Sequence, residues 1–302
     1  MAKQKVLVVG STGKLGMLVA KQLKKEGKVD LRCSARTEEK IAALKKEYDD
    51  VVHLDLDDET TFKSALEGVT GLFIVTGYTV DMLVQVKTLV DAAINAKVSH
   101  IVHLGVFTPQ RECTDAHFVW HQLLQTYIKS TPIPWTFLHP NFFMQNVLNP
   151  PLAVNGEINW FGGTSSYGWI ALEDVAECTA KIFAEGPAVH GGKDYWFSTE
   201  SLSMASAAKI IGEVVGTTIK VNDFSPQDLL AMLQKMGVTD AYMLKGVVGF
   251  FEQVIDGRLF YVGNEQDDCP AILGRKGLTF RQWADSHKED LQALYRPLSR
   301  KV

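Results

Sequence analysis

Residues 5–16, KVLVVGSTGKLG, decide the fold of this chain. They join an apolar run to three glycines, Gly10, Gly13 and Gly16, spaced as G-x-x-G-x-x-G, and an amphipathic stretch follows them. The first glycine allows a tight turn out of a strand, the second lets backbone N–H groups approach a diphosphate, and the third lets a helix pack on the sheet. The positive end of that helix then faces the phosphates. Because a β-α-β pattern follows, the segment predicts a dinucleotide site rather than an ordinary tight turn.

Short β-branched runs alternate with amphipathic stretches over the first 140 residues. The runs are continuously apolar, which is typical of strands that are buried on both faces of a parallel sheet. After the first run, Leu15, Val19 and Leu23 share one face of a helix. This rhythm predicts an α/β fold of the Rossmann type, a doubly wound parallel sheet covered by helices. The predicted strands are 6–9, 31–34, 51–54, 72–76, 101–104 and 135–138.

The rhythm loosens past Asn149-Pro150-Pro151, which suggests a domain boundary. We expect a dinucleotide-binding domain over residues 1–149, with 169–186 packing back onto it. Residues 150–302 would form a smaller, mainly helical lobe that faces the substrate. Helices are predicted there at 173–185, 203–215, 226–236 and 280–295.

Composition restricts the class of partner. The chain has 302 residues, 46% of them hydrophobic, and a formal net charge of -4. Nothing in this balance favours nucleic acid or an anionic membrane surface, so we expect a small-molecule partner. No apolar run approaches the roughly 20 residues of a membrane-spanning helix, and the short polar N-terminus lacks the pattern of a signal peptide. The four separated cysteines are interpreted as reduced thiols, and we expect a cytoplasmic protein, either monomer or homodimer.

The choice between NADP(H) and NAD(H) is set where the second strand ends. An NAD site places Asp or Glu there, whereas this sequence has Arg36. A guanidinium can bind a 2′-phosphate through two parallel hydrogen bonds, and Lys40 could add charge one helical turn later. NADP(H) is therefore the predicted cofactor. The alternative is that Arg36 is simply a solvated residue at a helix start.

Other cofactor contacts are expected at the carboxyl ends of the strands, where ligands collect in open α/β sheets. Asp55 suits an adenine contact, although capping of the next helix is an equally good role for Asp57 or Asp58. The cofactor-binding residues that we predict are Gly10, Ser11, Thr12, Gly13, Lys14, Leu15, Gly16, Arg36, Lys40, Asp55, Leu56, Thr76, Gly77, Tyr78, Leu104, Gly105, Val106, His139, Pro140, Asn141 and Phe142.

The glycine loop, Ala35-Arg36, Asp55, residues 139–143 (HPNFF) and residues 170–176 (IALEDVA) together make the chain similar to the NmrA-like atypical short-chain dehydrogenases. The similarity extends over nearly the whole chain. It implies NADP(H) binding and a Rossmann-type fold. The family includes NADPH-dependent quinone reductases, flavin-free azoreductases, plant benzylic ether reductases and cofactor-sensing regulators, so membership alone does not give the activity.

Two histidines stand where relatives often carry Lys or Glu, and the Tyr-x-x-x-Lys pair of carbonyl-reducing short-chain dehydrogenases is not found in this part of the sequence. His117 and His121 would project from one face of a helix and are the candidate catalytic residues. They could protonate a reduced quinone or azo group, or position an aromatic substrate. A zinc pair is a weaker interpretation because no third ligand has convincing spacing, and simple core packing is as reasonable for either residue.

Aromatic residues cluster just past the sixth predicted strand. Flat aromatic substrates stack well on such walls, although rings near a domain junction often fill core instead. The candidate substrate-binding residues are Phe107, Phe143, Trp160 and Tyr167.

These features predict a reductase that carries hydride from NADPH directly to a conjugated aromatic acceptor, a quinone or an azo compound, without flavin. One alternative is a non-catalytic NADPH sensor that uses the same fold, which the missing Tyr/Lys pair favours. Another is a reductase of a biosynthetic imine or benzylic ether.

Overall fold

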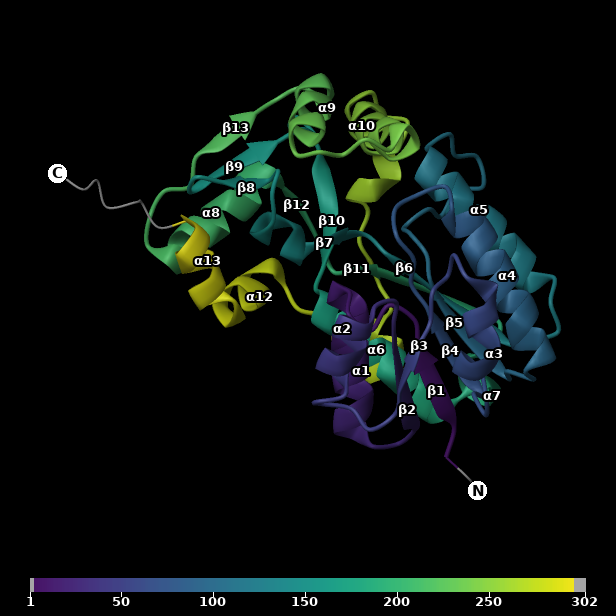
Figure 1. Cartoon of the computed structure of the whole chain (residues 1–302). Coiled ribbons are helices and arrows are strands. Elements are labelled where there is room, and N and C mark those ends of the chain that lie inside the picture. Colours follow the sequence, from purple (N-terminus) through teal and green to yellow (C-terminus); the bar gives the residue numbers. More distant parts are fainter. Residues whose placement is uncertain (1–2, 296–302) are drawn as a thin grey trace.

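The structure is a computed structural model that describes residues 3–295. Its centre is an eight-stranded sheet in the order β14-β11-β6-β5-β4-β1-β2-β3 (Figure 1). All neighbouring strands pair in parallel except β14, which pairs antiparallel with β11. The predicted Rossmann-type parallel sheet is confirmed. Its strands are β1 (Lys5–Val8), β2 (Asp30–Ala35), β3 (Val51–His53), β4 (Gly71–Ile74), β5 (His100–Leu104), β6 (Trp135–Pro140), β11 (Lys193–Ser198) and β14 (Gln266–Asp267).

Each face of the sheet has its own core, which explains why the strands are continuously apolar. Val6 and Val8 of β1 belong to the core on one face, and Leu7 and Val9 belong to the core on the other. The first face is covered by helices α1 (Lys14–Glu26), α6 (Leu172–Glu185) and α11 (Cys269–Leu273). The second is covered by α3 (Phe62–Ala65), α4 (Met82–Asn95) and α5 (Ala116–Lys129). Two further short helices are α2 (Glu38–Leu44) and α7 (Pro187–His190).

A lobe built mostly from the second half of the chain lies above the carboxyl ends of the strands, while α6, α7, α11, β11 and β14 of that half belong to the main sheet and its helices (Figure 1). The helices of the lobe are α8 (Met204–Val215), α9 (Pro226–Lys235), α10 (Ala241–Ile255), α12 (Phe280–Ser286) and α13 (Lys288–Tyr295). Two three-stranded sheets, β12-β10-β7 and β13-β9-β8, accompany them. Their strands are β7 (Phe142–Phe143), β8 (Ala153–Val154), β9 (Glu157–Trp160), β10 (Ser166–Ile170), β12 (Glu200–Ser203) and β13 (Val221–Asp223). Among the described residues, the 3-10 helices are η1 (Glu59–Thr61), η2 (Met144–Leu148) and η3 (Phe260–Gly263).

The lobe differs from the sequence prediction in three ways. The small sheets were not predicted, and neither was α10. The helix expected over 280–295 is broken at His287, whose backbone leaves the helical region at φ -107° and ψ 22°. The His287 side chain instead turns to Glu173, with Nε2 3.2 Å from the carboxylate. Within residues 3–295, no helix combines the length and the apolar character that crossing a bilayer requires.

Candidate active site

The loop between β1 and α1 is shaped by its glycines. Gly10 has φ +68°, a conformation that favours glycine, and its carbonyl accepts a hydrogen bond from the Gly13 amide at 2.8 Å. A Cβ on Gly16 would lie 2.1 Å from the Gly10 carbonyl oxygen, so the helix can sit this close to the loop only with glycine there. No side chain caps the N-terminus of α1. Its first-turn amides and positive dipole end therefore suit a diphosphate.

A groove of about 590 Å³ extends from this loop across the carboxyl ends of β2, β3 and β4. A dinucleotide that places its diphosphate on the loop would lie along it. Most of the predicted cofactor residues from the first 77 positions line it. The lining residues are Val9, Gly10, Thr12, Gly13, Ser34, Ala35, Arg36, Lys40, Leu54, Asp55, Leu56, Asp57, Val75, Thr76, Gly77, Thr79, Asp81 and Gln85.

Arg36 lies at the β2 end of this groove with its side chain 65% exposed. Its Nη1 is 4.0 Å from Asp57 Oδ2, a long and exposed ion pair that contributes little. Thr37 caps α2 by accepting a hydrogen bond from the Lys40 amide, which places Lys40 on the same groove. The guanidinium and the ammonium group are therefore available to an anionic group at this end.

A second cavity of about 360 Å³, here called the aromatic pocket, adjoins the groove. Val75, Thr76 and Gly77 line both spaces, so the two cavities are neighbours at the end of β4. The lining comes from the ends of β4, β5 and β6, from α5 and from α10. Its residues are Val75, Thr76, Gly77, Tyr78, Leu104, Gly105, Val106, Phe107, His117, Phe118, His121, Pro140, Asn141, Phe142, Phe143, Asn146, Val247, Phe250 and Phe251.

The two candidate catalytic histidines both line the aromatic pocket. Asp115 caps α5 by accepting a hydrogen bond from the Phe118 amide at 3.1 Å, and the helix then presents His117 and His121 on one face. Their Nε2 atoms are 3.2 Å apart, so one ring donates a hydrogen bond to the other. Tyr78 lies against His117 with the ring centroids 3.6 Å apart.

Burial keeps this histidine pair uncharged. It lowers the pKa of His117 to about 3. The pKa of His121 is also lowered far below its ordinary value, by burial and then by neighbouring His117, His103 and His139. Burial likewise raises the pKa of Tyr78, and the carboxylate of Asp115 adds to the effect. At neutral pH the pair can donate a hydrogen bond to a substrate but does not hold a ready imidazolium proton.

Several predicted site residues lie beneath the site rather than on its surface. Ser11 donates to the Val8 carbonyl and accepts from the Ser34 amide, so it ties the loop to β2. His139 stacks on Trp196 and bonds the Val106 carbonyl at 3.0 Å and Asp194 at 2.8 Å. The following predicted residues do not line either cavity: Ser11, Lys14, Leu15, Gly16, His139, Trp160 and Tyr167.

The two predicted substrate residues of the second lobe belong to its hydrophobic core. Trp160 is 1% exposed and Tyr167 is 0% exposed. Both rings contact Phe142, whose own ring reaches the aromatic pocket. They therefore hold a pocket residue in place from behind. Phe107 and Phe143, the other two predicted substrate residues, do line the pocket.

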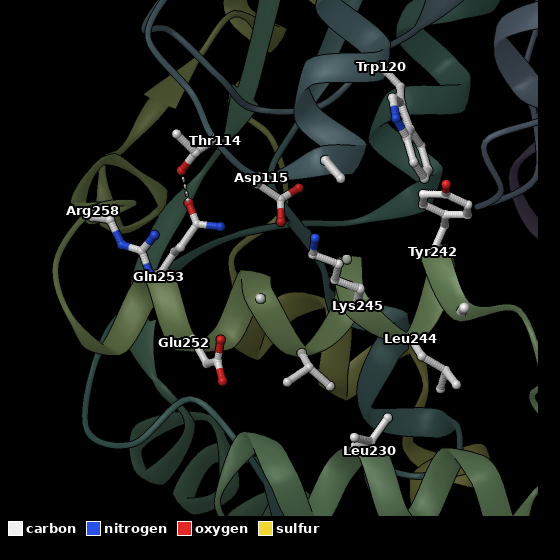
Figure 2. Close-up of a pocket in the computed structure, with 15 residues that line it drawn as sticks. Thr114, Asp115, Trp120, Leu230, Tyr242, Leu244, Lys245, Glu252, Gln253 and Arg258 are labelled. Carbon is white, nitrogen blue, oxygen red and sulfur yellow. Dashed lines mark hydrogen bonds between the residues drawn. The ribbon is translucent and has the colours of Figure 1, made fainter.

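Sequence reasoning missed the wall that α10 provides. Val247, Phe250 and Phe251 close the aromatic pocket from the second lobe. The spacing of Leu244, Val247, Val248, Phe251 and Val254 is that of an amphipathic helix, so the signal was present in the sequence. The opposite face of α10 borders a separate groove of about 740 Å³, shown in Figure 2.

The described residues offer no metal centre: among residues 3–295, no group of three or more His, Cys, Asp or Glu side chains is arranged to hold a metal ion. His117 and His121 thus have no third ligand of these types beside them in the described chain. Their proximity is better explained by the hydrogen bond between them.

Comparison with known proteins places this geometry in a family. The NAD(P)H azoreductase of Xenophilus azovorans is 25% identical over 285 residues, which cover 93% of this chain and 97% of the relative. Quinone oxidoreductase 2 of Escherichia coli is 26% identical over 245 residues, covering 78% and 83%. The structure of the Citrobacter sp. triphenylmethane reductase complexed with NADP(H) is similar in fold, with a TM-score of 0.76, 21% identity and coverage of 97% and 99%. The family model described as NmrA-like matches residues 2–259, and the chain belongs to the NmrA-like family.

Proposed function

We propose that this protein is an NADPH-dependent reductase that transfers hydride directly to a conjugated aromatic acceptor, a quinone or an azo compound, without flavin. The observation that carries the proposal is that the two cavities lie next to each other and share Val75, Thr76 and Gly77 as lining residues. A dinucleotide anchored at Gly10–Gly16 and running along the groove would bring its nicotinamide end into the aromatic pocket.

The cofactor is NADP(H), because the groove offers cations where an NAD site offers a carboxylate. Arg36 and Lys40 would hold the 2′-phosphate, and the uncapped end of α1 would hold the diphosphate. NADPH bound in this way supplies two electrons and one proton as hydride. The relative named as an NAD(P)H azoreductase and the structure of the triphenylmethane reductase complexed with NADP(H) support this assignment.

The acceptor is held by the pocket walls. Phe142 and Phe250 line the pocket, and a conjugated ring would pack against aromatic side chains of this kind. His139 donates a hydrogen bond to the Val106 carbonyl and so holds the chain that follows β5 in place. When hydride arrives, negative charge develops on the acceptor oxygen or nitrogen. The His117–His121 pair lies in the same pocket and can donate an N–H hydrogen bond to that atom. Solvent supplies the second proton that completes the hydroquinone or the hydrazo product.

The direct test is loss of NADPH absorbance when the purified protein is mixed with a panel of quinones and azo compounds. We expect turnover by protein that shows no flavin in its visible spectrum. NADPH binding should be measured in parallel by calorimetry. Binding without turnover of any acceptor would contradict the reductase proposal.

A cofactor sensor is the second candidate, because neither pocket histidine holds a proton ready for transfer at neutral pH. Such a protein would bind NADPH in the same groove and leave the acceptors unreduced. The absorbance and calorimetric measurements together separate the two functions.

A further inference from the structure

The aromatic pocket has no charged lining. Within the described chain, its lining residues include no Asp, Glu, Lys or Arg. Its titratable members are Tyr78, His117 and His121, and burial holds all three in their neutral forms at pH 7. A charged group that enters this pocket would lose hydration and find no counter-ion there.

The lining of the pocket is mainly apolar and aromatic. Phe107, Phe142 and Phe250 are among its residues, and their side chains offer no charge that could pair with an anionic group. The Asp115 carboxylate, which is 1% exposed, lies outside the pocket and lines the separate groove of Figure 2 together with Lys245.

The cations of α10 and its following turn lie outside the pocket. Lys245, on the face of α10 opposite to Val247 and Phe250, and Arg258, which follows the helix, line the separate groove of Figure 2. The Lys245 side chain is exposed, so solvent and salt screen its charge. No Lys or Arg among the described residues reaches the lining of the aromatic pocket.

Resting on the proposed reductase function, we infer that this pocket selects aromatic acceptors that carry no acid group and excludes sulfonated or carboxylated ones. The reaction is NADPH, a proton and a quinone giving NADP⁺ and a hydroquinone. Hydride brings two electrons and one proton, and solvent provides the other proton. An anionic acceptor would hold two negative charges in the pocket before that second proton arrives.

The test compares two naphthoquinones of matched size, one with a sulfonate on its benzene ring and one with an uncharged methylsulfonyl group at the same position. Because the methylsulfonyl group withdraws electrons more strongly than the sulfonate, each enzymatic kcat/KM is divided by the rate constant with which a free dihydronicotinamide reduces the same quinone. We expect kcat/KM for the sulfonate to be lower by about 100-fold or more, because an unpaired charge is costly to bury. Equal values for the two quinones would overturn the inference while leaving the reductase function in place.

A charge-bearing variant identifies the cause. Asn146 is half-buried on η2 and lines the pocket. Asn146→Lys supplies a cation, and Asn146→Met is a control of similar length without charge. We expect only the lysine variant to reduce the ratio of the two kcat/KM values, by about tenfold, because its ammonium group can pair with the sulfonate. If both variants change the ratio of the two kcat/KM values equally, charge is not the cause of the selectivity. If the wild type reduces neither quinone, the proposed reductase function itself is wrong.

Discussion

Arg36 has its guanidinium in solvent at the edge of the nucleotide groove, with only a long ion pair to Asp57. We expect Arg36→Ala to weaken NADPH binding by about 10- to 100-fold, the loss typical of hydrogen bonds to a charged group, and to leave NADH nearly unchanged. Arg36→Lys should fall between, because it keeps the charge and loses the planar fork. Calorimetric titration of both nucleotides measures these values, and an equal loss for NADPH and NADH would show that Arg36 does not contact the phosphate.

His117 and His121 are expected to act as a neutral hydrogen-bond donor. His117→Phe should lower kcat by roughly 10- to 100-fold at saturating NADPH, and His117→Gln, which keeps a donor, should lose less. Because burial keeps the pKa of His117 at about 3, the wild-type rate should show no step where an ordinary imidazolium titrates. Unchanged turnover in both His117→Phe and His121→Phe would remove the pair from the chemistry.

Asp115 predicts a pH dependence of stability. Burial raises the pKa of this carboxyl from 3.8 to about 6, so the folded state holds its proton more tightly than the unfolded state does. Ionisation then destabilises the fold above pH 6, and this cost disappears as the pH falls from about 6 to 4. Asp115→Asn keeps a good helix cap and should raise the unfolding free energy by about 2–3 kcal/mol at pH 8, and by less at pH 5.

Urea unfolding of the wild type and Asp115→Asn at both pH values measures that difference. A stabilisation of the same size at pH 5 and pH 8 would show that ionisation of Asp115 is not its source.

Single residues of the site differ in how far sequence can place them. Gly10 and Gly16 were predictable because a positive φ and a close helix contact leave room for glycine only. The buried positions of Trp160, Tyr167 and His139 were not, because they depend on which ring of an aromatic cluster packs inward. That choice is made by neighbours distant in sequence, such as Phe251 beside Trp160.

Helix α10 shapes the aromatic pocket through a glycine. A Cβ on Gly246 would lie 3.5 Å from the Tyr78 ring, an ordinary contact distance, so alanine fits. A larger side chain would push Tyr78 off His117. We expect Gly246→Leu to lower kcat/KM for acceptors by about tenfold with little change in NADPH affinity, as a displaced contact in a site does.

Gly246→Ala is the matched control for that variant and should also stabilise the helix by up to about 1 kcal/mol. Steady-state kinetics and calorimetry on the two variants measure the effects. If leucine leaves kcat/KM for the acceptors as high as alanine does, α10 does not set the shape of the pocket.

Among the elements, those with a strong period were the predictable ones. The six parallel strands of the first 140 residues are indicated by continuous apolar runs, and α1, α6, α8 and α9 by one apolar face with turn signals around them. The seventh parallel strand, β11, has the sequence KDYWFS, which is not such a run, and it was not predicted. The two-residue strands β7 and β8 have no period to detect and exist because the chain around them brings partners alongside. Likewise, His287 lies at the break between α12 and α13, and its side chain contacts Glu173, which is 114 positions earlier in the sequence. A contact between residues so far apart has no signal in the local sequence.

At the scale of the whole molecule, the second half of the chain returns to the central sheet. β11 pairs with β6, and β14 pairs with β11. Helix α6 also packs against α1, the helix that follows the glycine loop. The pairing of β11 with β6 and of β14 with β11 was not predicted, because the pairing of strands that are distant in sequence depends on the path of the lobe between them. The fold class was predictable, and so were most pocket residues at the strand ends and on α5, while the wall that α10 adds from the second half was not.

The proposed dinucleotide-binding domain can be tested as a fragment. Residues 1–149 would lack α6, which covers α1, and β11, which covers the edge of β6. We expect this fragment to lose cooperative thermal unfolding and NADPH binding, because its apolar face and sheet edge are uncovered. Circular dichroism with and without NADPH, against the full chain, measures this, and a cooperative transition that NADPH shifts upward would contradict the expectation.

The central claim is that hydride passes directly from NADPH to the acceptor in the two adjoining cavities. It is tested most directly by rapid mixing of the protein–NADPH complex with naphthoquinone, using NADPH that carries hydrogen or deuterium at the transferred position of C4. The account predicts that NADPH is oxidised in one phase, that deuterium slows this phase, and that no flavin signal accompanies it. Oxidation through a flavin phase, or a bound NADPH that survives mixing with the acceptor, would contradict the account.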